Sequence, residues 1–149
     1  MIRASSPRRF RHGFAALLGI AFLAACQKDP GTGPAQVKWD RDTCERCRMA
    51  VSDRKYAAQV RGGPKRRVFQ FDDIGCAVFW LKDQPWAAAP ETEIWVTDYR
   101  SGKWLDATKA CYVGGKTTPM YYGFGAVGEP MPGCVDFDGM RRDVLARGR

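Results

Sequence analysis

The sequence has 149 residues but only one histidine, His12, which lies in an N-terminal stretch that we expect to be removed. The mature protein would then contain no imidazole group. This absence excludes a Ser–His triad, a Cys–His nucleophile pair, a Cys₂His₂ zinc site and a copper site of the cupredoxin type. The chemistry of the protein must therefore rely on sulfur, carboxylate, amine or backbone groups.

The N-terminus also lacks an apolar run that could cross a membrane. The run there, residues 14–25, has twelve residues. A helix of that length spans roughly 18 Å, whereas the hydrocarbon core of a bilayer is about 30 Å thick. The run follows a basic segment and therefore indicates a secretory signal over residues 1–25. The basic residues are Arg3, Arg8, Arg9 and Arg11.

The signal ends in Leu23-Ala24-Ala25-Cys26, which resembles a bacterial lipobox. This resemblance implies that Cys26 becomes the lipid-modified first residue of a protein held by its lipid in a membrane. The expected location is the periplasmic side of the cell envelope of a Gram-negative bacterium, at the outer membrane. An ordinary signal that happens to contain a cysteine is the alternative. The pair Arg8-Arg9 leaves export by the twin-arginine route open beside the general secretory route.

A large excess of charge is absent from the expected mature chain. The whole sequence has a formal net charge of +8, from 24 Lys and Arg residues and 16 Asp and Glu residues. Four of the basic residues and none of the acidic ones lie in the signal, which leaves +4 for the rest. That excess gives no basis for nucleic-acid binding and supports only mild attraction to anionic surfaces.

Residues 26–36 are rich in glycine, proline and small polar residues, and we expect them to form a flexible tether. Residues 37–149 then form one domain. Its first half predicts a hairpin, with strands at 56–60 and 67–71 around a turn at 61–65. A buried helix from about 73 to 82 follows, begun by an aspartate N-cap, and a strand at 94–96 completes a ββαβ unit.

The second half of the domain is less regular. We expect a second unit from Trp104 onward, with strands at 110–113 and 135–137 and a short C-terminal helix capped by Asp138. In the segment 127–133, Pro130 and Pro132 make a helix unfavourable.

The main candidate site is Cys44-Glu45-Arg46-Cys47-Arg48-Met49, which places three soft sulfur donors within six residues. Thiolates and thioethers together select soft, thiophilic ions, above all Cu(I), and Cu(I) needs only two or three such ligands. Met49, or Met120 from the second unit, can complete a site built on Cys44 and Cys47. Arg46 and Arg48 would favour the thiolate form of the cysteines by their positive charge.

Several motifs follow one another in a fixed order along the chain. They are the lipobox at Cys26, Cys44-x-x-Cys47-x-Met49, Phe71-Asp72-Asp73, Val96-Thr97-Asp98-Tyr99, Trp104-Leu105-Asp106-Ala107 and Met120 before a Gly-Phe-Gly segment. Together, over about residues 40–126, they resemble the NosL family, the lipoprotein accessory factors of bacterial nitrous oxide reductase. The resemblance implies a periplasmic Cu(I)-binding lipoprotein that is not an enzyme and that delivers copper to the apo reductase or its maturation machinery. It also implies an α+β fold of two small ββαβ-type units, with an antiparallel sheet and a buried helix.

Other readings of Cys44 and Cys47 remain open at this point. A C-x-x-C pair in an oxidising compartment is also the reactive group of thiol–disulfide oxidoreductases. The pair can instead form a structural disulfide in a small, non-catalytic envelope lipoprotein. A structural zinc site is less favoured, because the sequence has no second C-x-x-C and the expected mature chain has no histidine.

Three cysteines lie outside this cluster and beyond the family motif. One disulfide and one buried thiol is the simplest allocation, and we expect Cys111 to pair with Cys134. Cys76 lies on the apolar helix and is interpreted as a core residue rather than a ligand. Asp72 and Asp73 are interpreted as helix-capping residues rather than as ligands of a hard metal.

Overall fold

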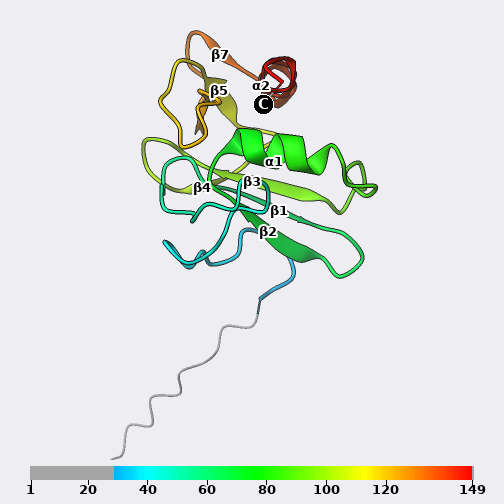
Figure 1. Ribbon diagram of the computed structural model, residues 1–149. Helices are drawn as coiled ribbons and strands as arrows, with labels where there is room; N and C mark the ends of the chain where they lie inside the picture. The colour runs from blue at the N-terminus through cyan, green and yellow to red at the C-terminus, as the bar shows by residue number, and fades with distance from the viewer. Residues whose placement is uncertain (1–28, 149) are drawn as a thin grey trace, which may run out of the picture.

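The computed structural model describes residues 29–148, and Figure 1 shows their arrangement. The predicted signal and the predicted lipidation site at Cys26 lie outside the described residues. The described part contains seven strands and two helices. These are β1 (Ala58–Gly62), β2 (Arg67–Phe71), α1 (Ile74–Leu81), β3 (Glu93–Thr97), β4 (Trp104–Asp106), β5 (Cys111–Val113), β6 (Gly125–Val127), β7 (Cys134–Val135) and α2 (Phe137–Ala146).

The larger sheet is antiparallel and has the strand order β2-β1-β3-β4. Ala58 faces Phe71 on one neighbour and Val96 on the other, which confirms the predicted hairpin and its return strand. Strand β4 was expected to open the second unit, but it pairs with β3 and extends the first sheet. The predicted turn begins too early, because β1 continues through Arg61 to Gly62.

Helix α1 forms as predicted and lies across one face of this sheet (Figure 1). Asp73 is the N-cap, with extended backbone and a carboxylate that accepts a hydrogen bond from the amide of Gly75. The apolar face of β2 meets the helix, since the ring centroids of Phe69 and Phe71 lie 4.5 Å and 5.4 Å from that of Trp80. Helix α1 is buried over most of its length because α2 packs on it as well.

The second unit is a small antiparallel sheet, β6-β5-β7, followed by α2. Its order is therefore three strands and then a helix, instead of ββαβ. The helix begins two residues earlier than predicted. Asp136, not Asp138, is the N-cap, and its carboxylate accepts from the amide of Gly139. The expected strand 135–137 is thus short, because Phe137 already belongs to the helix.

Residues 29–36 hydrogen-bond to the larger sheet, although the sequence predicts them as part of a flexible tether. The reason is Arg61, a β1 residue that is 1% exposed. A buried guanidinium needs partners, and Asp29 supplies two hydrogen bonds of 2.8 and 2.9 Å. Gly33 adds its carbonyl to the same side chain, and Ala35 exchanges two hydrogen bonds with Gln59.

The protein is therefore a small α+β fold with two antiparallel sheets and a buried helix, which confirms the predicted fold class. Within residues 29–148, neither helix is long and apolar enough to cross a bilayer.

The packing of α1 leads to a first prediction. Phe79 is 8% exposed and its ring lies against Tyr122 of the second unit, with a centroid distance of 5.7 Å. Phe79→Ala should lower the free energy of unfolding by about 3–5 kcal/mol, because it removes buried surface and leaves a cavity. Urea denaturation followed by circular dichroism measures the change.

Tyr121→Asn is the matched control. Tyr121 is 69% exposed and has a φ of 57°, a conformation that asparagine tolerates. Its effect should stay within about 0.5 kcal/mol. Equal losses in the two variants would contradict the assigned packing.

Candidate metal centre

A tight loop presents Cys44 and Cys47. The loop is closed by an antiparallel bridge between Thr43 and Ala50 and by a hydrogen bond of 2.8 Å from the Cys44 amide to the Met49 carbonyl. Arg48 adopts a φ of 65°, which reverses the chain inside the loop. The amide of Glu45 donates to the carbonyl of Gln70, so the loop is attached to the end of β2.

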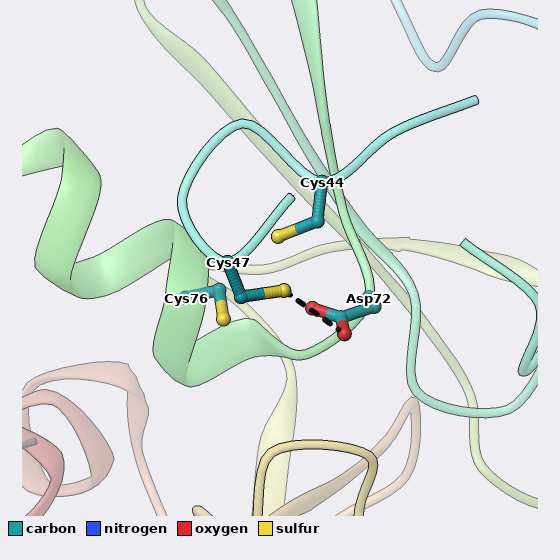
Figure 2. Close-up of side chains that lie close together, drawn as sticks. All are labelled: Cys44, Cys47, Asp72 and Cys76. Carbon is teal, nitrogen blue, oxygen red and sulfur yellow. Dashed lines mark hydrogen bonds between the residues drawn. The ribbon is translucent and has the colours of Figure 1, made fainter. Parts of the chain in front are cut away.

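The other side of the centre is the junction between β2 and α1. Strand β2 ends at Phe71, and Asp72 follows at once. Asp73 then caps the helix, which places Cys76 in its first turn with the side chain toward the loop (Figure 2). Cys44 and Cys76 are fully buried, Asp72 is 2% exposed and Cys47 is partly exposed.

These four residues converge, as Figure 2 shows. One potential ligand atom from each of Cys44, Cys47, Asp72 and Cys76 lies within 4.8 Å of every other. Metal–thiolate bonds are about 2.3 Å long in zinc proteins, so two sulfurs on one ion can lie up to about 4.6 Å apart. Small shifts would therefore bring the three sulfurs onto one soft ion.

The carboxylate of Asp72 lies beside the three thiols. Its Oδ2 accepts a hydrogen bond of 3.3 Å from the Cys47 thiol. Its Oδ1 is buried and has no hydrogen-bond partner among the described residues. Buried polar atoms are rarely left without a partner in native proteins. An orphaned oxygen among three free thiols fits a centre that takes up a cation.

The three thiols differ in acidity. A hydrogen bond from the Cys76 thiol lowers the pKa of Cys44 to about 6, against the desolvating effect of its burial. Burial is the main cause that raises the pKa of Cys47 to about 12. The pKa of Cys76 is also raised, first by its hydrogen bond to Cys44 and then by burial. One thiolate is thus held ready at neutral pH, and a metal would displace protons from the other two.

The two arginines of the motif have a different role from the predicted one. Arg46 points to Tyr122 of the second unit, whose hydroxyl accepts a hydrogen bond from Nη1 at 2.7 Å. The guanidinium also lies 4.6 Å from the centroid of the Phe79 ring on α1. Arg48 is exposed and pairs with Glu45 at 3.5 Å. Arg46 therefore connects the cysteine loop to the second unit, while the largest cause of the lowered pKa of Cys44 is the neighbouring Cys76 thiol.

Of the two predicted methionine ligands, Met49 follows Cys47 in the same loop, and Met120 comes from the second unit. Met49 is 55% exposed, and its carbonyl helps to close the cysteine loop. Met120 is half-buried, and its amide donates to Asp73 Oδ2, so its backbone is fixed at the start of α1. Both thioethers remain predicted ligands.

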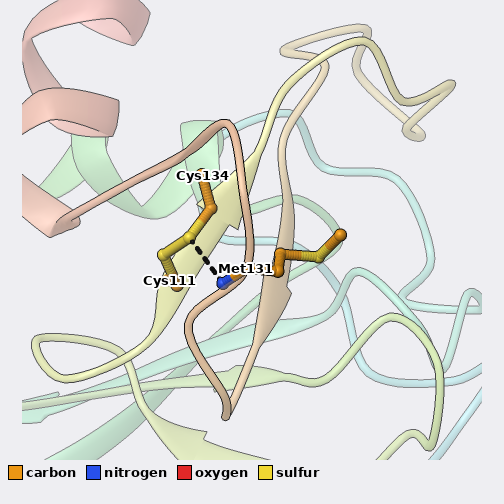
Figure 3. The surroundings of a disulfide bond; sticks show 3 residues. All are labelled: Cys111, Met131 and Cys134. Atoms are coloured by element: carbon orange, nitrogen blue, oxygen red, sulfur yellow. Dashed lines mark hydrogen bonds between the residues drawn. A yellow bond between two sulfur atoms is a disulfide. The ribbon is translucent and has the colours of Figure 1, made fainter.

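The remaining cysteines are allocated as predicted. Cys111 and Cys134 form a disulfide between β5 and β7, with Cα atoms 5.7 Å apart (Figure 3). The amide of Met131 donates to the Cys134 sulfur. Cys76 is a buried free thiol as expected, but the interpretation as core alone missed its position in the cluster. Asp72 was missed too, since only its neighbour Asp73 caps the helix.

The family model for NosL matches residues 35–126, which include all four cluster residues and Met49 and Met120. None of the curated proteins matches the chain significantly.

The arrangement of thiols predicts an unusually acidic cysteine. In the reduced protein, one thiol should ionise with a pKa near 6, and Cys76→Ala should move that ionisation up toward the ordinary cysteine value of about 8.5, because the donor is lost. The ultraviolet absorbance of the thiolate as a function of pH measures both values.

Cys47→Ala is the matched control, since it removes a thiol of the same cluster but keeps the donor Cys76. The low ionisation should persist in this variant. Absence of any thiolate below pH 8 in the intact protein would contradict the assigned hydrogen bond.

Proposed function

The chain belongs to the NosL family, and from this premise we propose that it is a lipid-anchored Cu(I) carrier of the cell envelope. Its cargo would serve the maturation of nitrous oxide reductase. Family membership and the cysteine–aspartate cluster together fit a copper-binding role.

The observation that carries the proposal is the convergence of three free thiols in one largely buried centre. Cu(I) is the common biological ion that a few sulfur ligands satisfy fully. Cys44, Cys47 and Cys76 would hold it, with Met49 or Met120 as a neutral thioether ligand. The nearby carboxylate of Asp72 is a hard donor, so competition with Zn(II) belongs in any test.

A carrier must also release its ion, and the exposures of the ligands suit that need. Cys44 and Cys76 are buried, whereas Cys47 is partly exposed and Met49 is 55% exposed. A sulfur from a partner could therefore replace the ligands one by one, starting at the exposed side. The proposed recipient is the apo reductase or its maturation machinery.

The geometry favours a carrier over a thiol–disulfide oxidoreductase. Such enzymes attack with an exposed cysteine of low pKa. Here the acidic thiol, Cys44, is fully buried, and the more exposed Cys47 has a pKa raised to about 12. The pair also lies in a loop instead of at the start of a helix.

Copper stoichiometry tests the proposal. The reduced protein should bind one Cu(I) and retain it against excess Zn(II), as measured by native mass spectrometry. Cys44→Ser with Cys47→Ser should abolish binding, because a hydroxyl is a hard and weakly acidic ligand. Mixed with the apo reductase, the loaded protein should lose its copper to the enzyme.

Methionine variants supply the control. Met49→Leu with Met120→Leu should weaken copper binding, whereas Met131→Leu, beside the disulfide of the second unit, should not (Figure 3). Copper uptake unchanged in the double-serine variant would refute the site. Rapid catalysis of disulfide exchange without copper uptake would favour an oxidoreductase.

A further inference from the structure

A groove of about 330 Å³ lies at the tip of the β1–β2 hairpin. The tip is the end of the larger sheet away from the cysteines, because β2 runs from Arg67 at the tip to Phe71, and the cluster residue Asp72 follows. The groove is lined by Gly62, Gly63, Pro64, Lys65, Arg67, Phe69 and Trp86.

The floor of the groove is aromatic and is built through close packing. Trp86 stacks on Phe69, with centroids 5.8 Å apart, and lies directly on the backbone at Gly62. A Cβ atom at Gly62 would come within 2.3 Å of the indole ring, so only glycine leaves room for it. The indole is half-buried and keeps one part toward the surface.

The rim of the groove is basic. Lys65 and Arg67 are exposed and form no ion pair with any residue that the structure describes. The acidic groups around them are mostly neutralised, since Asp29 is paired with Arg61 and Glu93 with Arg66. The exposed carboxylate of Glu91 offsets part of the positive charge of the rim.

The N-terminal segment reaches the sheet at this same end. The carboxylate of Asp29 is bound by Arg61, and the carbonyl of Gly31 and the side chain of Glu93 are bound by Arg66 (Figure 1 shows this segment in blue beside the sheet). Three peptide units connect Cys26 to Asp29, and an extended chain of that length spans at most roughly 11 Å. A lipid on Cys26 would therefore hold the hairpin tip close to a bilayer.

We propose that the hairpin tip, with Lys65, Arg67 and Trp86, docks on the anionic phospholipid headgroups of the membrane that holds the lipid anchor; this rests on the proposed acylation of Cys26. Basic side chains are attracted to anionic headgroups, and tryptophan favours the membrane interface. The cysteine cluster, at the other end of β2 and roughly 15 Å farther away, then faces the periplasm.

Lysine footprinting on the native acylated protein tests this orientation. The acetylation rates of Lys65, Lys55 and Lys103 are measured by mass spectrometry in detergent, in phosphatidylcholine vesicles and in vesicles of phosphatidylglycerol with phosphatidylethanolamine. Lys55 precedes β1 and Lys103 precedes β4, so both mark the opposite end of the sheet. In the anionic vesicles the rate at Lys65 should fall roughly fivefold, the effect of one basic side chain near such a surface, while the other two rates should not change.

Charge reversal sharpens the test. Arg67→Glu should remove most of the protection of Lys65, whereas Arg100→Glu, an exposed arginine at the far end, should leave it intact. Inorganic phosphate added to the detergent sample should not protect Lys65. Equal protection by phosphate would mean that the groove binds a soluble anion, and the proposal would be wrong.

The intact mass of the protein separates the two ways of failing. Uniform labelling of the three lysines on an acylated protein would overturn the docked orientation alone. Absence of an acyl group would overturn the anchor and the orientation with it. Neither result bears on copper binding, which is measured separately.

Discussion

The buried carboxylate of Asp73 connects the helix, the second unit and the metal centre. One oxygen accepts from the Gly75 amide and starts α1, and the other accepts from the Thr118 hydroxyl and the Met120 amide. Burial raises the pKa of Asp73, and these three hydrogen bonds oppose that shift. Because the helix starts at this point, Asp72 and Cys76 fall on either side of the cap and face the cysteine loop. Position 75 must also be glycine for the second unit to pack here, since a Cβ atom there would lie 2.1 Å from the Tyr122 ring.

In the proposed carrier, different residues of the centre would hold the metal and expose it for release. Two sulfurs are buried in the core, and a third lies at the surface on a loop held by Gln70 and by Arg46. Arg46 contacts Tyr122 and Phe79, and these contacts connect the loop to the second unit and to α1. In the proposed membrane orientation, the partly exposed sulfur of Cys47 would face soluble partners in the periplasm.

Local patterns in the sequence predicted the helix and the hairpin, which depend on interactions between residues close together in the chain. The aspartate before an apolar stretch at helical spacing located α1, and two apolar strands around a glycine-containing turn located the β1–β2 hairpin. The sequence could not show that Cys76 approaches Cys44, because a loop 32 positions earlier makes that contact in three dimensions. The attachment of residues 29–36 was missed for the same reason, since the buried partner is Arg61 in a distant strand.

The central claim is that Cys44, Cys47 and Cys76 together hold one Cu(I), and X-ray absorption of the copper-loaded protein tests it most directly. The spectrum should show Cu(I) surrounded by sulfur alone, and Cys76→Ala should remove one sulfur neighbour while the copper stays bound to the other two cysteines. A coordination shell dominated by oxygen or nitrogen, or a spectrum that Cys76→Ala leaves unchanged, would contradict the claim.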